Sequence, residues 1–173
     1  MTTVLSYLRL ILFLGGALIG VQIPGFVDQY GKSLESHLRE SSTSLQAFQR
    51  DADKYFDGDI QRLIAHYKNN GDPVFTSGGG SIDTIYQRNL ALKTAELEFG
   101  QGFLSAYEQV FIHPVRDIRD EVWNSYTYGI KLDRSAIGMG LLLGFILAVL
   151  VEIPLRGLLA ALVALTRKPK LRY

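Results

Sequence analysis

The sequence AIGMGLLLGFILAVLV occupies residues 136–151 and contains no charged side chain. A helix of about 20 apolar residues crosses the ~30 Å hydrocarbon core of a bilayer. We therefore predict a transmembrane helix over residues 136–153. Apolar sequence resumes from Leu158 to Leu165, beyond a short stretch that contains charged residues and a proline. The whole run is too long for one simple crossing.

Pro154 divides this apolar run. A single straight helix over the run would be about 45 Å long, against a core of about 30 Å. Because proline lacks an N–H group and clashes with the preceding turn, we predict that the crossing ends near Ile153. Residues 154–173 are then a cytoplasmic interfacial helix and a basic tail. The alternative is a tilted span that includes both halves, with Glu152 and Arg156 buried and paired.

A second apolar segment, residues 10–27, lies near the start of the sequence between Arg9 and Asp28. It is also long enough to cross a bilayer, so we predict an N-terminal transmembrane helix over residues 1–27. A cleaved signal peptide is the alternative. The segment has no convincing small-x-small cleavage site and runs through Pro24 into a continuing helical pattern, which favours an uncleaved anchor.

The charges that flank the two spans predict their orientation. Basic residues follow the second span: Arg156, Arg167, Lys168, Lys170 and Arg172. Positive residues are retained on the cytoplasmic side of a membrane, so the C-terminus is expected there. Two crossings return the N-terminus to the same side, in agreement with Arg9. The middle of the chain, residues 28–135, is then extracytoplasmic, which in a bacterium means periplasmic.

The composition excludes several classes of function. The 173 residues carry a net charge of +1, which gives nucleic acid binding no electrostatic basis. The sequence contains no cysteine, which excludes disulfides, thiolate zinc sites and cysteine nucleophiles. No catalytic constellation, cofactor motif or metal-ligand spacing occurs, so we expect neither an enzyme nor a cofactor or metal site.

The middle segment reads as a long antiparallel helical hairpin. One arm runs from Val27 to about Tyr67, the turn occupies residues 71–80, and the second arm runs from Ser81 to about Ile130 with an interruption at His113-Pro114. Each arm carries one narrow apolar stripe, as in a coiled coil. The first stripe comprises Tyr30, Leu34, Leu38, Leu45, Phe48, Ala52, Tyr55, Ile60, Leu63 and Tyr67. The second comprises Ile82, Ile85, Tyr86, Leu90, Leu97, Phe103, Leu104, Tyr107, Val110 and Phe111. Because each stripe is narrow, the hairpin is expected to pack against a second copy or another envelope protein.

Two stretches carry a family resemblance: GGALIGVQIPGFVDQYGKSLESHL, residues 15–38, and SIDTIYQRNLALKTAELEF, residues 81–99. Together they resemble a family of small bacterial inner-membrane proteins classified only as a domain of unknown function, number 2937. The most specific part is QIPGFVDQY, residues 22–30. The resemblance covers nearly the whole chain and implies a Gram-negative inner membrane. It implies no catalytic residue and no substrate.

Two sets of residues are candidate sites within the spans. The first is a set of glycines spaced by four: Gly16, Gly20, Gly140 and Gly144. This spacing lets two helices approach closely in lipid, either within one chain, which the tethered spans favour, or in a dimer. The second is the pair Glu152 and Arg156, which we interpret as an interfacial ion pair rather than an ion pathway.

These observations predict a non-enzymatic scaffold or accessory subunit whose periplasmic hairpin mediates self-association or partner binding. The alternative is an oligomeric channel or transporter component, motivated by the glycine-rich spans and by Glu152. An envelope sensor is a third possibility, although the tail after Leu165 is too short for a typical output domain.

Overall fold

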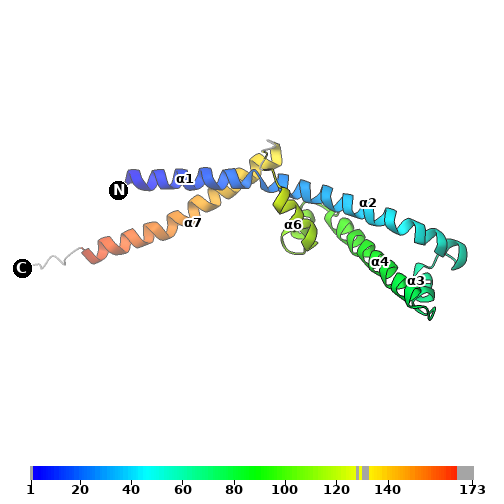
Figure 1. The fold of residues 1–173 in the computed structure, drawn as a ribbon. Helices are drawn as coiled ribbons and strands as arrows, with labels where there is room; N and C mark the ends of the chain where they lie inside the picture. The colour runs from blue at the N-terminus through cyan, green and yellow to red at the C-terminus, as the bar shows by residue number, and fades with distance from the viewer. Residues whose placement is uncertain (1, 128, 130–132, 167–173) are drawn as a thin grey trace, which may run out of the picture. The chain divides into compact units, whose positions relative to one another are not determined.

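The computed structural model describes residues 2–127, 129 and 133–166, and the chain is helical throughout this part, with no strand (Figure 1). The predicted all-α class is therefore confirmed. Contacts divide the chain into two units. Unit 1 comprises Met1–Phe26 and Thr127–Tyr173, and unit 2 comprises Val27–Tyr126. Three predicted features lie outside the described residues: the end of the second arm at Ile130, the side chain of Arg156 and the basic tail, residues 167–173.

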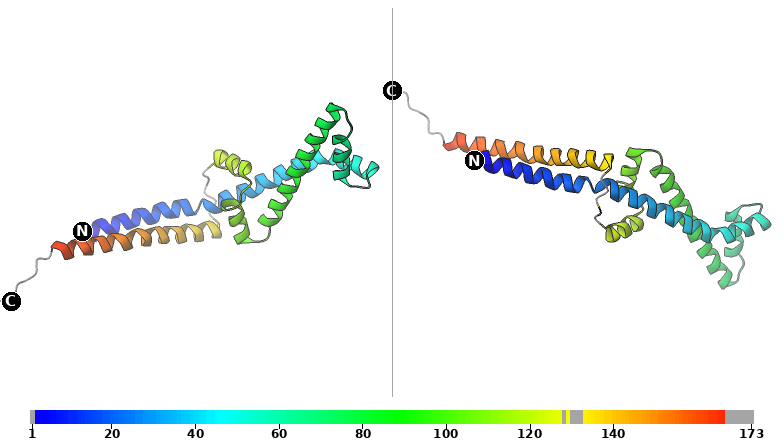
Figure 2. Two further views of the ribbon diagram at one scale, coloured as in Figure 1. Left: turned by 90° about the horizontal axis from the view of Figure 1, so that it is seen from below. Right: turned by 90° about the horizontal axis from the view of Figure 1, so that it is seen from above.

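Unit 1 is a pair of antiparallel helices. α1 (Thr2–Gly20) and α7 (Arg134–Thr166) lie side by side, and the start of α1 and the end of α7 are at the same end of the pair (Figure 2). Two helices in the described part are long and apolar enough to cross a membrane. One begins at Ser6 in α1, and the other is Arg134–Pro154 in α7. The apolar composition that predicts two spans is thus carried by helices of sufficient length.

α7 continues without interruption through Pro154. The sequence predicts a separate helix after Ile153, and this prediction of a break is wrong. A proline removes one backbone hydrogen bond and introduces a local clash, but apolar helices tolerate this loss when the residues on both sides favour helix. The long apolar run from Leu155 to Thr166 therefore extends the same helix.

The passage from α1 to α2 (Ile23–Tyr55) contains a short turn at Val21 and Gln22. The sequence predicts an uninterrupted helix here, and the structure corrects this point. Pro24 has no N–H to donate to the carbonyl of Gly20, so the helical ladder cannot run straight through. Pro24 instead occupies the first turn of α2, where an N–H has no intrahelical partner in any case.

In unit 2 the first predicted arm is divided. α2 ends at Tyr55, and α3 (Ile60–Lys68) begins after a turn in which Asp57 and Gly58 have positive φ. Asp59 caps α3, because its carboxylate accepts hydrogen bonds from the first free backbone N–H groups of the helix. The first arm, predicted as one helix from Val27 to about Tyr67, is therefore two helices.

α4 (Pro73–Phe99) begins at Pro73, so the turn predicted over residues 71–80 is wrong from Pro73 onwards. Asp72 caps the helix by accepting from the Val74 N–H at 2.8 Å, and proline is well suited to the first helical position. The glycines that follow are helical. Gly79 faces α3, where an added Cβ would lie 2.9 Å from the backbone nitrogen of Lys68. The glycine run therefore permits close helix packing instead of forming a loop.

α4 returns along α2. The Asn89 side chain donates to Ser42 Oγ at 2.8 Å, and Phe99 lies over Gly31. These pairs run in opposite order along the two helices, which makes the packing antiparallel. One core cluster lies where α2, α3 and α4 meet, and its buried members are Leu45, Ala52, Ile60, Leu63, Ile64 and Ile82.

Within α4 the second predicted stripe faces the core only as far as Tyr86, whereas Val110 of the same stripe is buried in the helix that follows α4. Beyond Tyr86 the buried positions of α4 are Leu92 and Ala95, whereas Leu90 and Leu97 are exposed. The helix also ends at Gly100, and α5 (Phe103–Phe111) and α6 (Arg116–Ser125) follow as separate short helices. A single stripe cannot pass through these breaks. The interruption predicted at His113-Pro114 is present, between α5 and α6.

Candidate functional site

The four spaced glycines lie along one seam between α1 and α7. A methyl group added at Gly20 would lie 2.7 Å from the Cα of Gly140, and one added at Gly16 would lie 2.9 Å from the Cα of Gly144. Real Cβ atoms do not approach backbone this closely, so only glycine permits the observed separation. The seam joins two helices of one chain, which is the arrangement that a close small-residue packing motif supports in lipid.

A charged pair lies towards the other end of the same helices. Arg9 Nη1 is 3.6 Å from Glu152 Oε2, across the α1–α7 interface. The two residues line a groove with a volume of ≈ 600 Å³, whose other walls include Phe13 and Phe145. The sequence suggested Arg156 as the partner of Glu152. The side chain of Arg156 lies outside the described residues, so that pairing stays a prediction. Arg9 is a partner that no spacing rule could identify, because it is far from Glu152 in the sequence.

Tyr30 is the central buried polar residue of unit 2. Its side chain is fully buried, and its hydroxyl oxygen accepts a hydrogen bond from the backbone N–H of Val115 at 3.0 Å. The side chain of Gln109, also buried, is hydrogen-bonded to the same hydroxyl, and the ring of Phe99 lies against that of Tyr30. Burial raises the pKa of Tyr30. This residue holds α4, α5 and the start of α6 against α2.

Glu121 on α6 connects to α2 through two hydrogen bonds. Ser33 Oγ donates to one carboxylate oxygen at 3.1 Å, and His37 Nε2 lies 2.8 Å from the other. The bond with His37 is the main reason that the pKa of Glu121 falls below its ordinary value. Both partners bind the carboxylate and not each other, so the group lacks the serine-to-histidine contact that activates a nucleophile.

A second ion pair links α4 to α6. The guanidinium of Arg88 binds the carboxylate of Asp117 through both of its terminal nitrogens. Burial alone would raise the pKa of Asp117, but the hydrogen bonds and charge of Arg88 lower it overall. The sequence carries no signal for this pair, because its members belong to different helices.

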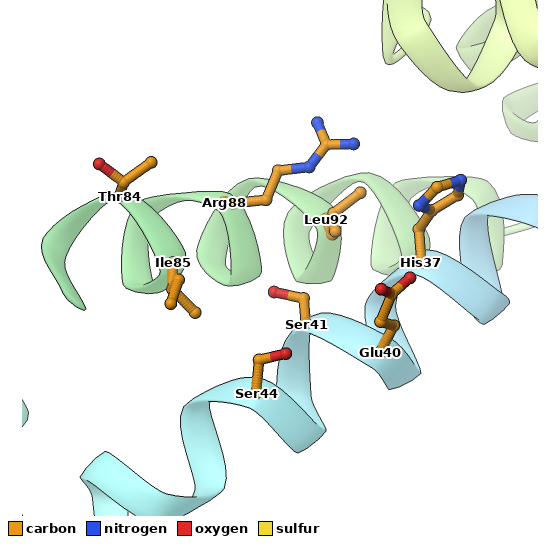
Figure 3. A pocket seen from close by; sticks show the side chains of 8 residues that line it. All are labelled: His37, Glu40, Ser41, Ser44, Thr84, Ile85, Arg88 and Leu92. Carbon is orange, nitrogen blue, oxygen red and sulfur yellow. The ribbon is translucent and has the colours of Figure 1, made fainter. Parts of the chain in front are cut away.

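A groove with a volume of ≈ 310 Å³ lies between α2 and α4. Figure 3 shows the side chains that line it. Its lining residues are His37, Glu40, Ser41, Ser44, Thr84, Ile85, Arg88 and Leu92. The histidine and the arginine are both engaged with carboxylates of α6, and the remaining polar groups are a carboxylate and hydroxyls. Within residues 2–127, 129 and 133–166, no group of three or more His, Cys, Asp or Glu could hold a metal ion. The side chains that line the groove therefore offer hydrogen-bond donors and acceptors.

Exposed apolar side chains form the other notable surface of unit 2. Leu90 and Leu97 are seven residues apart on α4, with exposed fractions of 48% and 63%. Residues seven apart share one face of a helix. Leu90 also lines a groove of ≈ 580 Å³ between α2 and α4, together with Tyr86, Lys93 and polar residues of α2. This α4 face, Leu90 and Leu97, is a candidate association surface.

Comparison with known proteins gives one result. A family model described as "Protein of unknown function (DUF2937)" matches residues 4–164, which include most of α1, most of α7 and all of unit 2. No curated protein and no solved structure matches the chain.

Proposed function

We propose that this chain, which belongs to the family of proteins of unknown function DUF2937, is a non-enzymatic scaffold or accessory subunit of a bacterial inner membrane. In this proposal α1 and α7 are paired spans, both termini are cytoplasmic, and unit 2 is a helical hairpin in the periplasm. The part of α7 after Pro154 lies at the cytoplasmic boundary. Unit 2 then binds a second copy or another envelope protein.

The observation that carries this proposal is the α4 face. Leu90 and Leu97 remain exposed although α4 packs against α3 and contributes Ile82 to the core that it shares with α2. Large apolar side chains that recur on one helix face are typical of protein interaction surfaces. His37 and Arg88 of the groove in Figure 3 are paired with carboxylates of α6, which supports binding in preference to catalysis.

The test is extraction of the chain from native membranes in mild detergent, followed by native mass measurement and identification of co-purifying chains. We expect a stable assembly, either of identical chains or with a defined partner. Leu90→Ser combined with Leu97→Ser should dissociate it while the thermal stability stays close to wild type. Val74→Ser is the matched control, because Val74 is 78% exposed and lies at the start of the same helix. A monomer without a reproducible partner would count against the proposal.

An oligomeric channel or transporter component is the second candidate. Arg9 and Glu152 line a groove of ≈ 600 Å³ between two helices that are apolar enough to span a membrane. Ionisable residues inside a membrane often mark ion pathways. Ion flux through the reconstituted oligomer that disappears in Glu152→Gln would support this role. Flux that is absent, or that does not depend on Glu152, would leave Arg9 and Glu152 as a pair that holds α1 to α7.

A further inference from the structure

α5 has one buried face and one exposed apolar face. Gln109 and Val110 are buried against the rest of unit 2. Phe103, Leu104 and Phe111 are exposed by 58%, 79% and 53%, and Tyr107 stacks on Phe103 with ring centroids 4.6 Å apart. At 100° per residue these four side chains fall within one arc of the helix. We call this arc, Phe103, Leu104, Tyr107 and Phe111, the α5 aromatic face.

The α5 aromatic face belongs to the end of unit 2 at which the chain both enters and leaves. Gln29 and Ser125, close to the two ends of the unit, are within 3.5 Å of each other through their side chains. Tyr30 bonds to Gln109 of α5 and to Val115 just after it. The opposite end of unit 2 is the α3–α4 turn, where Val74 lies. α4 alone separates the two ends by about 40 Å at 1.5 Å per residue.

Covalent tethers hold the first of these ends close to both apolar helices. α1 ends at Gly20, and α2, which includes the first residues of unit 2, starts at Ile23. On the other side, residues 127–133 connect Tyr126 to α7 and reach at most about 25 Å when fully extended. If the two apolar helices insert in a bilayer, this end of unit 2 cannot leave the neighbourhood of its surface.

We propose that the α5 aromatic face is a lipid-contact surface that inserts into the headgroup region of the membrane. The inference rests on the proposed function for the insertion of α1 and α7. Aromatic and leucine side chains on one face of a helix are the residues that bind bilayer interfaces. The only charged residue of α5 is Glu108, so the face itself meets no charge penalty in a neutral headgroup layer. Unit 2 would then be held against the bilayer at one end instead of pivoting on its tethers.

Intrinsic fluorescence can test this contact, because Trp123 is the only tryptophan of the sequence. In a Trp123→Phe background we would introduce one reporter at a time: Phe103→Trp or Leu104→Trp on the α5 aromatic face, Val74→Trp at the opposite end of unit 2, and Leu14→Trp in α1. The full chain would be reconstituted in phosphatidylcholine vesicles that contain lipids brominated near the carbonyl end of the acyl chains or near the bilayer centre. Unchanged helicity and melting temperature would select the variants to be compared.

We expect Phe103→Trp and Leu104→Trp to lose most of their emission with the lipid brominated near the carbonyl end of the acyl chains. Leu14→Trp should be quenched by at least one of the two brominated lipids. Val74→Trp should keep its emission with both. Quenching of Leu14→Trp without quenching of the α5 reporters would overturn the lipid contact and leave the insertion of α1 standing. Equal quenching of Val74→Trp and the α5 reporters would also overturn it, because the contact would not be specific to one end. Absence of quenching at Leu14→Trp would contradict the membrane insertion itself.

Discussion

Gly20 of α1 and Gly140 of α7 approach so closely that a methyl group on the first would lie 2.7 Å from the Cα of the second. The carbonyl oxygen of Met139 would lie equally close to that methyl group. Both obstacles are backbone atoms, which cannot rotate away as a side chain can. The separation of α1 and α7 is thus set by the absence of side chains at this point.

Gly20→Ala should therefore destabilise unit 1. The two helices must move apart to accept the new methyl group, and such overpacking costs about 1–3 kcal/mol. Gly15→Ala makes the same change on the same helix at a position with open space around it, and should leave the stability unchanged or slightly higher. Thermal unfolding of the two variants in the same detergent checks this. Equal melting temperatures for both would contradict the proposed role of the seam.

Tyr30→Phe should destabilise unit 2. The substitution keeps the buried ring but leaves the backbone N–H of Val115 and the side chain of Gln109 without their shared partner. Leaving a buried polar group unsatisfied costs about 1–3 kcal/mol. Tyr55→Phe is the control, because Tyr55 is exposed. Circular dichroism during heating should show a lower melting temperature for Tyr30→Phe than for wild type. The melting temperature of Tyr55→Phe should be unchanged.

Two neighbouring glycines of α4 should respond to alanine in opposite directions. A Cβ at Gly79 would lie 2.9 Å from the Lys68 backbone nitrogen, whereas one at Gly80 meets open space. Gly80→Ala should stabilise the chain by up to about 1 kcal/mol, because alanine favours helix. Gly79→Ala should lower its stability, because α3 and α4 must separate. If both variants were stabilised, the close α3–α4 contact would not exist in solution.

Glu121 should make the stability depend on pH. The bond with His37, and then that with Ser33, lowers the pKa of Glu121 in the folded chain below its ordinary value of 4.5. The contribution of the ionised Glu121 carboxylate to the stability of the fold is therefore complete above about pH 4.5. It is lost as the pH falls through the lowered pKa of Glu121 in the folded chain.

The measurement is the melting temperature of wild type and of Glu121→Gln between pH 7 and pH 3. At neutral pH the free energy of unfolding of wild type should exceed that of Glu121→Gln by about 0.2–1 kcal/mol, the range for an exposed pair. This difference between the two proteins should shrink below pH 4.5. Glu40→Gln makes the same change in charge without touching the Ser33–Glu121–His37 contacts. A difference that is constant across this range would show that protonation of Glu121 is not responsible.

Local patterns in the sequence predict the helical class, the two apolar helices and the main interruptions. These patterns predict wrongly where the same residue type is compatible with two local structures. The glycines at 78–80 read as a loop, but Asp72 and Pro73 form a strong helix start and Gly79 is needed for packing against Lys68. Pro154 reads as a helix end, yet the apolar residues on both sides continue α7.

The contacts that organise unit 2 could not be predicted from spacing. Arg88 and Asp117, or His37 and Glu121, come together only because α6 folds back over α2 and α4. Within α4 the predicted stripe is correct only as far as Tyr86, because Leu92 and Ala95 take the core positions further along that helix. Val110 of the same stripe is buried in α5. A fully buried tyrosine requires a hydrogen-bond partner, but the sequence does not identify Val115 as that partner.

We propose that α1 and α7 are paired spans that hold unit 2 outside the cytoplasm. Because the sequence contains no cysteine, single substitutions can be labelled without further changes. Cells that express Thr3→Cys, Ser36→Cys or Tyr173→Cys would be treated with a membrane-impermeant maleimide after the outer membrane has been permeabilised. We expect Ser36→Cys to be labelled while the inner membrane is intact, and Thr3→Cys and Tyr173→Cys to be labelled only after lysis. Labelling of either terminal position before lysis, or protection of Ser36→Cys, would contradict it.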